Sequence, residues 1–361
     1  MKVRIGDLTK IRTGKLDANA ASMDGQYPFF TCSKEPLRIS TYSYDCECVL
    51  VAGNGDLNVK YYNGKFDAYQ RTYIIENNNV EKLYLPYLYC FLETYIKELR
   101  KQAIGGVIKY IKICNLSDAV IELPSIEKQK KIVKILKTSK KCLDMRNTQM
   151  AVLDGLIKAR FVELFGDPRS NPYGFGKKLL RDTCKVVTGN TPSRSVEAYY
   201  GDYVEWIKTD NIVSGLLNPT KATESLSEEG MKVGRTVEKG SILMACIAGS
   251  IASIGRVCVT DRRVAFNQQI SAIVPEEYNI LFLYVLLQLS KEYLVEEINM
   301  ALKGILSKSK LEEKEFIVPP MELQEQFADF VHQVDKSKVV VQKALDEAQI
   351  LFDSLMQKYF G

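Results

Sequence analysis

The sequence is poor in the residues that build metal centres and nucleophilic active sites. Histidine occurs once, at position 332, and none of the nine cysteines belongs to a Cys-x-x-Cys pair. The chain therefore has no ligand set for zinc, and we interpret the cysteines as reduced residues of the core. It also lacks a Gly-x-x-x-x-Gly-Lys-Ser/Thr phosphate loop and a Gly-x-Gly-x-x-Gly fingerprint. We expect no catalytic residue, no metal and no cofactor bound by this chain.

Long hydrophobic runs are missing as well. The longest, Leu83 to Leu92 and Ile280 to Leu287, are shorter than the roughly 20 residues that cross a bilayer, and the N-terminus lacks a signal-peptide core. We therefore expect a cytoplasmic protein. The 361 residues are 46% hydrophobic and 26% charged, which is typical of two or three well-packed domains. The net charge of +5 is too small to indicate nucleic-acid binding by itself.

Two parts of the sequence resemble each other. Ile5-Gly6-Asp7-Leu8 with Thr13-Gly14-Lys15 returns, at an offset of 175, as Leu180-Arg181-Asp182-Thr183 with Thr188-Gly189-Asn190. The pattern Pro-x-x-Glu-x-Gln at residues 124–129 returns at 319–324, an offset of 195. Two similar modules suit a partner with two similar sites, such as double-stranded DNA. Because the offset grows along the chain, the loops differ, which favours an asymmetric target over a palindrome.

A long helix is predicted after each copy. Apolar residues recur at alternating steps of three and four from Ile132 to Leu164 and from Phe327 to Tyr359, which is typical of coiled coils. The first series is interrupted by Ser139, Arg146 and Arg160, and the second by Lys338. Residues 124–166 carry 10 basic and 4 acidic side chains, whereas 319–361 carry 4 and 7. The helices are therefore complementary in charge, and we predict that they pair with each other. The alternative is that each packs only on its own domain.

The fold class follows from this order of segments. Short β-rich runs alternate with turn signals in each copy, and single helices are predicted over Tyr84 to Lys101 and Ile280 to Ile298. We predict an α+β protein in which two similar domains, 1–123 and 177–318, alternate with two long spacer helices, 124–166 and 319–361, that form an antiparallel coiled coil. Two prolines within residues 167–176 mark a linker.

Three features together carry a resemblance to a known family. They are the repeated Pro-x-x-Glu-x-Gln start, the run Phe-Val-Glu-Leu-Phe-Gly-Asp-Pro at residues 161–168, and the segment from Ser253-Ile254-Gly255 to Asn267-Gln268-Gln269. With the order domain, long helix, domain, long helix, they resemble the specificity subunit of type I restriction-modification systems over essentially the whole chain. In the first copy, Asn54-Gly55-Asp56 stands where the second has Ser-Ile-Gly, so the resemblance is weaker there.

The resemblance implies a function without catalysis in this chain. Two target-recognition domains would each read half of a split, asymmetric site on double-stranded DNA, and the coiled coil would set the gap between the halves. Two methyltransferase subunits would dock on it and methylate adenine with S-adenosylmethionine, with translocating restriction subunits as optional further partners. The chain itself has no Asn/Asp-Pro-Pro-Tyr methyltransferase motif, and its nearest approach, Asn171-Pro172-Tyr173-Gly174, lacks the second proline.

Candidate DNA-binding residues gather near turns in both copies. Asn and Gln pair with adenine edges, Arg and Lys with guanine edges, and cations and hydroxyls with phosphates. In the first copy the candidates are Lys34, Asn54, Lys60, Tyr69, Gln70 and Arg71. In the second they are Lys208, Thr209, Asn211, Ser253, Arg256, Arg262, Arg263, Asn267, Gln268 and Gln269.

Alternatives remain open for these residues and for the chain. The glutamines either contact DNA or bridge turns of their own domain, and phosphate contact is favoured over base reading for Arg262 and Arg263. Trp206 is interpreted as a core anchor, and the segment that it begins is matched with residues 27–34. A different class of function is a coiled-coil scaffold that joins two proteins without DNA. Salt-dependent binding to duplex DNA would separate these two functions.

Overall fold

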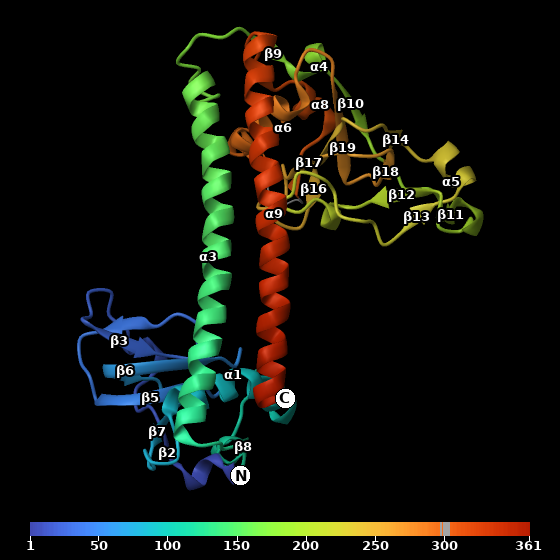
Figure 1. The fold of residues 1–361 in the computed structure, drawn as a ribbon. Helices are drawn as coiled ribbons and strands as arrows, with labels where there is room; N and C mark the ends of the chain where they lie inside the picture. Colours follow the sequence, from blue (N-terminus) through green and yellow to red (C-terminus); the bar gives the residue numbers. More distant parts are fainter. Residues whose placement is uncertain (297, 299–303) are drawn as a thin grey trace. The chain divides into compact units, whose positions relative to one another are not determined.

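The chain folds as two compact units, each built around one β-rich domain. The computed structural model describes residues 1–296, 298 and 304–361 (Figure 1). One unit comprises Met1–Arg146 with Ala344–Gly361, and the other comprises Asn147–Lys343. The long helices α3 (Ile126–Phe165) and α9 (Met321–Phe360) each contribute one part to each unit. The predicted α+β class is confirmed, while the predicted domain boundaries stay a prediction.

The first domain is a six-stranded sheet covered by helix α1 (Leu85–Gln102). Its strand order is β2-β7-β5-β6-β3-β4, and of the strand pairs described in this sheet only β3 and β6 run parallel. The strands are β2 (Thr9–Thr13), β3 (Tyr27–Phe30), β4 (Leu37–Ile39), β5 (Tyr44–Ala52), β6 (Val59–Ala68) and β7 (Thr72–Asn77). A separate pair, β1 (Lys2–Arg4) with β8 (Val120–Glu122), joins the two ends of the domain, and α2 (Ile113–Ser117) precedes β8.

The second domain is also rich in β-strands, but its strands form two main sheets instead of one. One has the order β10-β19-β15-β17 and the other β11-β13-β12-β18-β14. The first contains β10 (Cys184–Thr188), β15 (Ile242–Ala245), β17 (Val257–Val259) and β19 (Ile270–Pro275). The second contains β11 (Tyr200–Gly201), β12 (Val204–Ile207), β13 (Ser225–Leu226), β14 (Thr236–Val237) and β18 (Val264–Phe266). Here β12 and β18 run parallel, as β3 and β6 do in the first domain.

Smaller elements complete the second domain. Two further strand pairs are β9 (Lys177–Leu179) with β21 (Glu315–Ile317), and β16 (Ile247–Ala248) with β20 (Gly304–Ile305). The short helices are α4 (Leu180–Thr183), α5 (Glu228–Val233), α6 (Ile280–Leu289), α7 (Lys291–Val295) and α8 (Lys308–Glu312). The single helix predicted over residues 280–298 is therefore wrong. It breaks at Ser290, whose φ of −90° and ψ of 12° lie outside the helical region.

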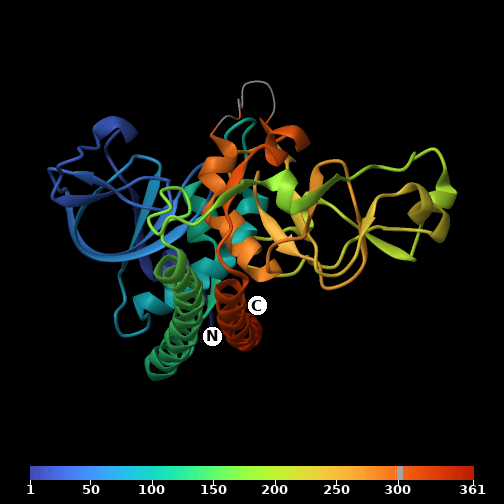
Figure 2. The same cartoon turned by 90° about the horizontal axis from the view of Figure 1, so that it is seen from above.

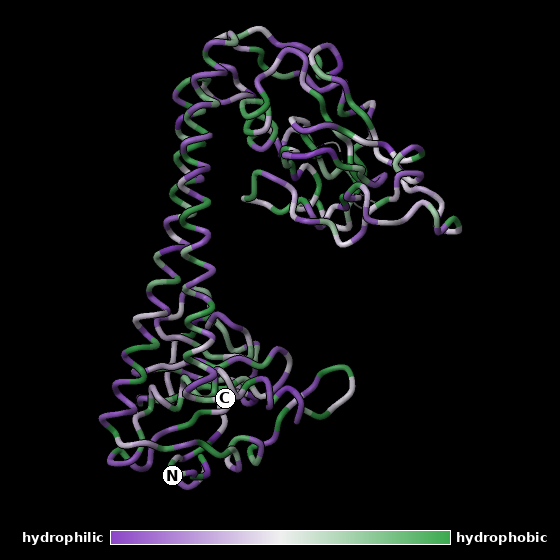
Figure 3. The backbone as a smooth tube through the Cα atoms, turned by 45° about the vertical axis from the view of Figure 1, so that its right-hand side comes forward, coloured by the Kyte–Doolittle hydropathy of each residue, from purple (hydrophilic) through white to green (hydrophobic). Residues whose placement is uncertain are grey.

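The two long helices pair in antiparallel fashion, as predicted. The beginning of α3 shares a unit with the end of α9, and the end of α3 shares the other unit with the beginning of α9. The two helices lie alongside each other when seen nearly end on (Figure 2), and hydrophobic segments recur along the region in which their traces overlap (Figure 3). Lys338, which breaks the apolar series of α9, is buried and donates to the Asp154 carboxylate at 2.8 Å and the Gly215 carbonyl at 2.9 Å.

Equivalent contacts attach the helices to both domains. Gln129 and Gln324 end the two copies of the Pro-x-x-Glu-x-Gln pattern and are fully or almost fully buried, at 0% and 1% exposure. The side-chain carbonyl of Gln129 accepts the backbone N–H of Tyr84 at 2.8 Å, and that of Gln324 accepts the N–H of Asn279 at 2.9 Å. Each amide also donates at 2.8 Å to the carbonyl of the proline that opens its pattern. The repeated glutamine therefore fixes each helix to the domain that precedes it.

The end of the other long helix packs on each domain through a phenylalanine. Phe360 lies 5.1 Å from Tyr87 between ring centroids, and Phe165 lies 4.8 Å from Phe282. The two pairs are related by the offset of the glutamines, since Phe165 matches Phe360 and Tyr87 matches Phe282. Gly166 ends α3 with φ +71° and donates its N–H to the Val162 carbonyl, a left-handed cap that only glycine adopts readily. Each domain is thus contacted by both long helices.

Candidate nucleic-acid interface

The parallel strand pair of each domain ends in the same turn. The Tyr69 N–H donates to the Phe30 carbonyl at 2.9 Å, and the Asn267 N–H donates to the Ile207 carbonyl at 3.1 Å. In both domains the sheet therefore presents a turn of three residues at the same place, Tyr69-Gln70-Arg71 in the first and Asn267-Gln268-Gln269 in the second. This register also confirms the predicted match between the segments that begin at Tyr27 and at Trp206.

Two glycines of the repeat lie beneath these turns. A Cβ atom on Gly14 would lie 2.2 Å from the Ala68 carbonyl oxygen, and one on Gly189 would lie 2.2 Å from the Asn267 carbonyl oxygen. Neither backbone oxygen can move without moving its turn. Both glycines belong to the Thr-Gly dipeptide that is repeated in the sequence. Their close packing under the two turns was not predicted from that repeat.

The middle residue of each turn is an exposed glutamine. Gln70 and Gln268 are both exposed, whereas Asn267 is 7% exposed and its amide is bound to Gln269. The Gln70 side chain forms no hydrogen bond with the described residues, and the Gln268 carbonyl accepts from the Thr191 hydroxyl. Arg71 beside Gln70 is exposed and forms no ion pair within the described part of the chain. The two turns therefore present one amide each, in different surroundings.

The other candidates of the first domain surround its turn or line the neighbouring loop. Gly53, beside Asn54, donates its N–H to the Arg71 carbonyl at 2.7 Å, so the loop that holds Asn54 adjoins the turn. The Lys34 ammonium lies 4.0 Å from the Asp56 carboxylate and is 77% exposed. Lys60 donates to Asn58, and burial lowers the pKa of its ammonium.

In the second domain, Arg256 joins two of the predicted loops. Its guanidinium donates at 3.2 Å both to the Ser253 carbonyl and to the Thr209 carbonyl. Ser253 is also hydrogen-bonded to Ser250 through the two hydroxyl groups. The structure thus brings Thr209, Ser253 and Arg256 together, although Thr209 lies far from the other two in the sequence.

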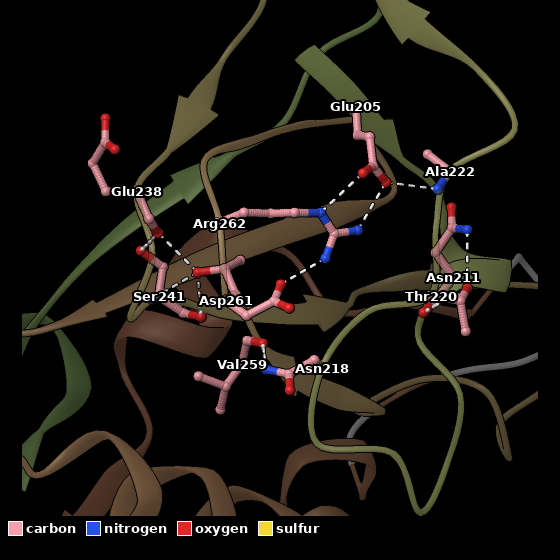
Figure 4. Close-up of polar contacts among 11 residues, drawn as sticks. Glu205, Asn211, Asn218, Thr220, Ala222, Glu238, Ser241, Val259, Asp261 and Arg262 are labelled. Carbon is pink, nitrogen blue, oxygen red and sulfur yellow. Dashed lines mark hydrogen bonds and ion pairs between the residues drawn. The ribbon is translucent and has the colours of Figure 1, made fainter. Parts of the chain in front are cut away.

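Several predicted DNA-binding side chains are occupied by contacts within the domain, and Figure 4 shows two of them, Arg262 and Asn211. Glu205 accepts from Arg262 Nε at 3.0 Å and from a second guanidinium nitrogen at 2.8 Å, and Asp261 accepts from the third at 2.6 Å. Arg262 accordingly lowers the pKa of the Glu205 carboxyl group. Arg263 donates to Glu238 at 2.6 Å. In these positions both arginines have carboxylate partners within the domain.

Lys208 and Asn211 are also engaged. The Lys208 ammonium donates to Glu224 and lies 5.2 Å from the centroid of the Trp206 ring. Asn211 is 7% exposed and donates at 3.2 Å to the Thr220 hydroxyl and to the Lys221 carbonyl. Asn211 therefore shapes its loop from inside. Trp206 is 3% exposed, as expected for a core anchor.

The described residues contain no cluster of three or more His, Cys, Asp or Glu side chains that could hold a metal ion. Within the same part of the chain, no helix is both long and apolar enough to traverse a bilayer. Five of the nine cysteines are buried, two are partly buried, and Cys114 and Cys142 are exposed. The expectation that the cysteines belong to the core is therefore wrong for these two.

Comparison with known proteins places these features in a family. The model of the type I restriction modification DNA specificity domain matches residues 1–154 and 172–348. The chain belongs to this family. Its two matched parts coincide with the two copies of the sequence repeat.

Individual relatives agree with this assignment. The chain is 44% identical over 136 residues to the EcoDI type I restriction enzyme specificity subunit of Escherichia coli, a match that covers 38% of this chain and 30% of that protein. It is 24% identical over 309 residues to the MjaIX specificity subunit of Methanocaldococcus jannaschii, covering 79% of this chain and 69% of the relative. The chain thus matches less than a third of the length of the E. coli protein.

A solved structure supports the fold. The S subunit of a type I restriction-modification system from M. genitalium superposes with a TM-score of 0.67 at 17% identity, covering 100% of this chain and 96% of the other. At this identity the likeness concerns the fold: two β-rich domains with long helices that pack together.

Proposed function

We propose that this specificity subunit binds a bipartite, asymmetric sequence on double-stranded DNA, with one domain for each half. The observation that carries the proposal is the pair of equivalent turns that expose Gln70 and Gln268. An amide side chain can pair in bidentate fashion with an adenine edge in the major groove. Because the residues beside the two glutamines differ, the two half-sites differ in sequence.

The remaining candidates act around these turns. Arg71 provides a cation next to Gln70, and Lys34 and Lys60 provide cations elsewhere in the first domain; we propose that they contact phosphates or guanine edges. In the second domain, Arg256 positions Thr209 and Ser253 for backbone contacts. Arg262 and Arg263 contribute only if DNA phosphates replace the carboxylates that now hold them. Lys208 likewise contacts DNA only if a phosphate replaces Glu224. Asn211, Asn267 and Gln269 stabilise the loops of the second domain from within, and Tyr69 stabilises its own turn.

The proposed assembly follows the family. Two methyltransferase subunits dock on this chain and carry S-adenosylmethionine, and the paired helices hold the two reading domains at a fixed spacing on the DNA. Translocating restriction subunits are optional further partners of this complex. Adenine methylation at the bound site is then the product that reports what the chain recognises.

The test is a methylome comparison between cells with and without the gene, followed by variants of the two glutamines. Gln268→Ala is expected to relax sequence choice at one half-site and Gln70→Ala at the other, because each lost base contact costs on the order of 1 to 3 kcal/mol. Gln288→Ala, an exposed glutamine on α6, is the matched control. The proposal fails if methylation shows no sequence dependence on the chain, or if both variants change the same half-site.

A further inference from the structure

A short loop of the first domain carries apolar side chains into solvent. Val107 is 104% exposed, Ile108 62% and Ile104 45%. Scattered exposed apolar residues are common on protein surfaces, but neighbouring ones on a projecting loop indicate a contact with another molecule. The loop connects α1 to α2, and we refer to Val107 and Ile108 as its apolar tip.

The loop is held in shape by backbone hydrogen bonds. Ile104 and Tyr110 form an isolated antiparallel bridge, with N–H to carbonyl distances of 3.0 and 2.8 Å. Gly105 has φ +115°, and a Cβ atom there would lie 2.7 Å from the Ile108 carbonyl oxygen. Glycine is thus needed for the tight reversal. A closed loop of this kind presents its tip without a large loss of conformational entropy on binding.

The same kind of hydrogen bond ties the loop to the proposed DNA-binding residues. Gly55 donates its N–H to the Lys109 carbonyl at 3.0 Å, Ile111 donates to the Gly53 carbonyl at 2.9 Å, and Asn54 forms a bridge with Tyr110. The loop that holds Asn54 in turn adjoins the turn with Gln70. The apolar tip therefore projects from the neighbourhood that the sequence and the fold indicate for DNA.

The sequence on both sides of the tip carries charge of one sign. Residues 99–117 contain four cations, Arg100, Lys101, Lys109 and Lys112, and no aspartate or glutamate. Arg100 and Lys101 are paired with Asp56 and Glu98, at 2.9 and 2.6 Å. Lys109 and Lys112 are exposed and form no ion pair with the described residues. Lysines without an ion pair beside an apolar tip suit a partner that is both polyanionic and partly apolar. Nucleic acid is such a partner, because its phosphates are charged and its bases offer apolar surface.

We propose that Val107 and Ile108 contact the bases of the first half-site, while Lys109 and Lys112 hold the adjoining phosphates. This inference rests on the proposed function and adds an apolar contact to the polar readout by Gln70. Apolar side chains contact the thymine methyl group in the major groove or enter between base steps, and both contacts depend on sequence. Phosphate contacts by the lysines add affinity without sequence preference.

The test compares two kinds of variant in the complex of full-length chain and methyltransferase subunits. The probes are a duplex with the methylome-defined site and a scrambled duplex, each measured over a range of salt concentrations. The double variant Val107→Ser, Ile108→Ser is expected to weaken binding to the specific duplex about 10-fold or more and to leave the slope against log salt unchanged. Lys109→Gln is expected to weaken both duplexes and to reduce that slope by about 0.9.

Controls separate this inference from the proposed function. Val80→Ser changes another exposed valine of the first domain, at 76% exposure, and should bind like wild type. If the double variant binds the specific duplex as well as wild type does, the tip does not contact DNA. If it instead weakens assembly with the methyltransferase subunits, the tip contacts protein and the inference is overturned. Wild type that fails to prefer the specific duplex would refute the proposed function itself.

Discussion

Replacing the buried glutamine at the start of α9 should destabilise the second domain strongly. In Gln324→Leu the Asn279 N–H and the Pro319 carbonyl both lose their partner. A buried polar group left unpaired costs about 1–3 kcal/mol, so two of them give about 2–6 kcal/mol. That range is comparable with the whole stability of many domains, which is about 5–15 kcal/mol.

The chain provides its own reporter for this experiment. Its single tryptophan, Trp206, is 3% exposed in the second domain, so urea unfolding followed by tryptophan fluorescence reports on that domain. Gln326→Leu is the matched control, because Gln326 lies on the same helix and is exposed. Relative to this control, Gln324→Leu should lower the free energy of unfolding by a further amount of about 2 kcal/mol or more. A difference below about 0.5 kcal/mol, the size of an ordinary surface substitution, would refute the reasoning that the amide secures the helix.

Three further predictions concern the turns, the ion pairs and the helices. Gly189→Ala should displace the turn of the second domain and relax one half-site only, as methylome sequencing would reveal. Because Arg262 lowers the pKa of Glu205 in the folded protein, that ion pair stabilises above the unfolded pKa of about 4.3 and is lost as pH falls further. Glu205→Gln should therefore lower the free energy of unfolding by about 1 kcal/mol at pH 7. In urea unfolding the difference from wild type should shrink as the pH falls below that unfolded pKa. Deleting four residues within Ala348 to Phe352, about 6 Å of helix, should change the gap between half-sites and not the bases read; an unchanged gap in the methylome would contradict this.

The architecture could be predicted because its signals are local or repeated. Apolar periodicity predicted both long helices, and the repeat placed Gln129 and Gln324 in equivalent positions. The break at Ser290 was missed because the residues on both sides continue a helical pattern. Ion pairs between residues far apart in the sequence could not be predicted either. Arg262 meets Glu205 across 57 residues and Arg263 meets Glu238 across 25, so the sequence suggests free cations where the fold has ion pairs.

The exchange of helix ends between the domains bears on how such a chain could have arisen. The first domain is closed by Phe360 from the far end of the sequence, and the second by Phe165 from the middle. A single module that ends at a residue like Phe165 would carry this phenylalanine at the end of its long helix. It would lack the second long helix whose phenylalanine packs on its own domain. Two copies of the module could complete each other by exchange. In this arrangement the single chain is equivalent to a dimer of two modules fused into one polypeptide.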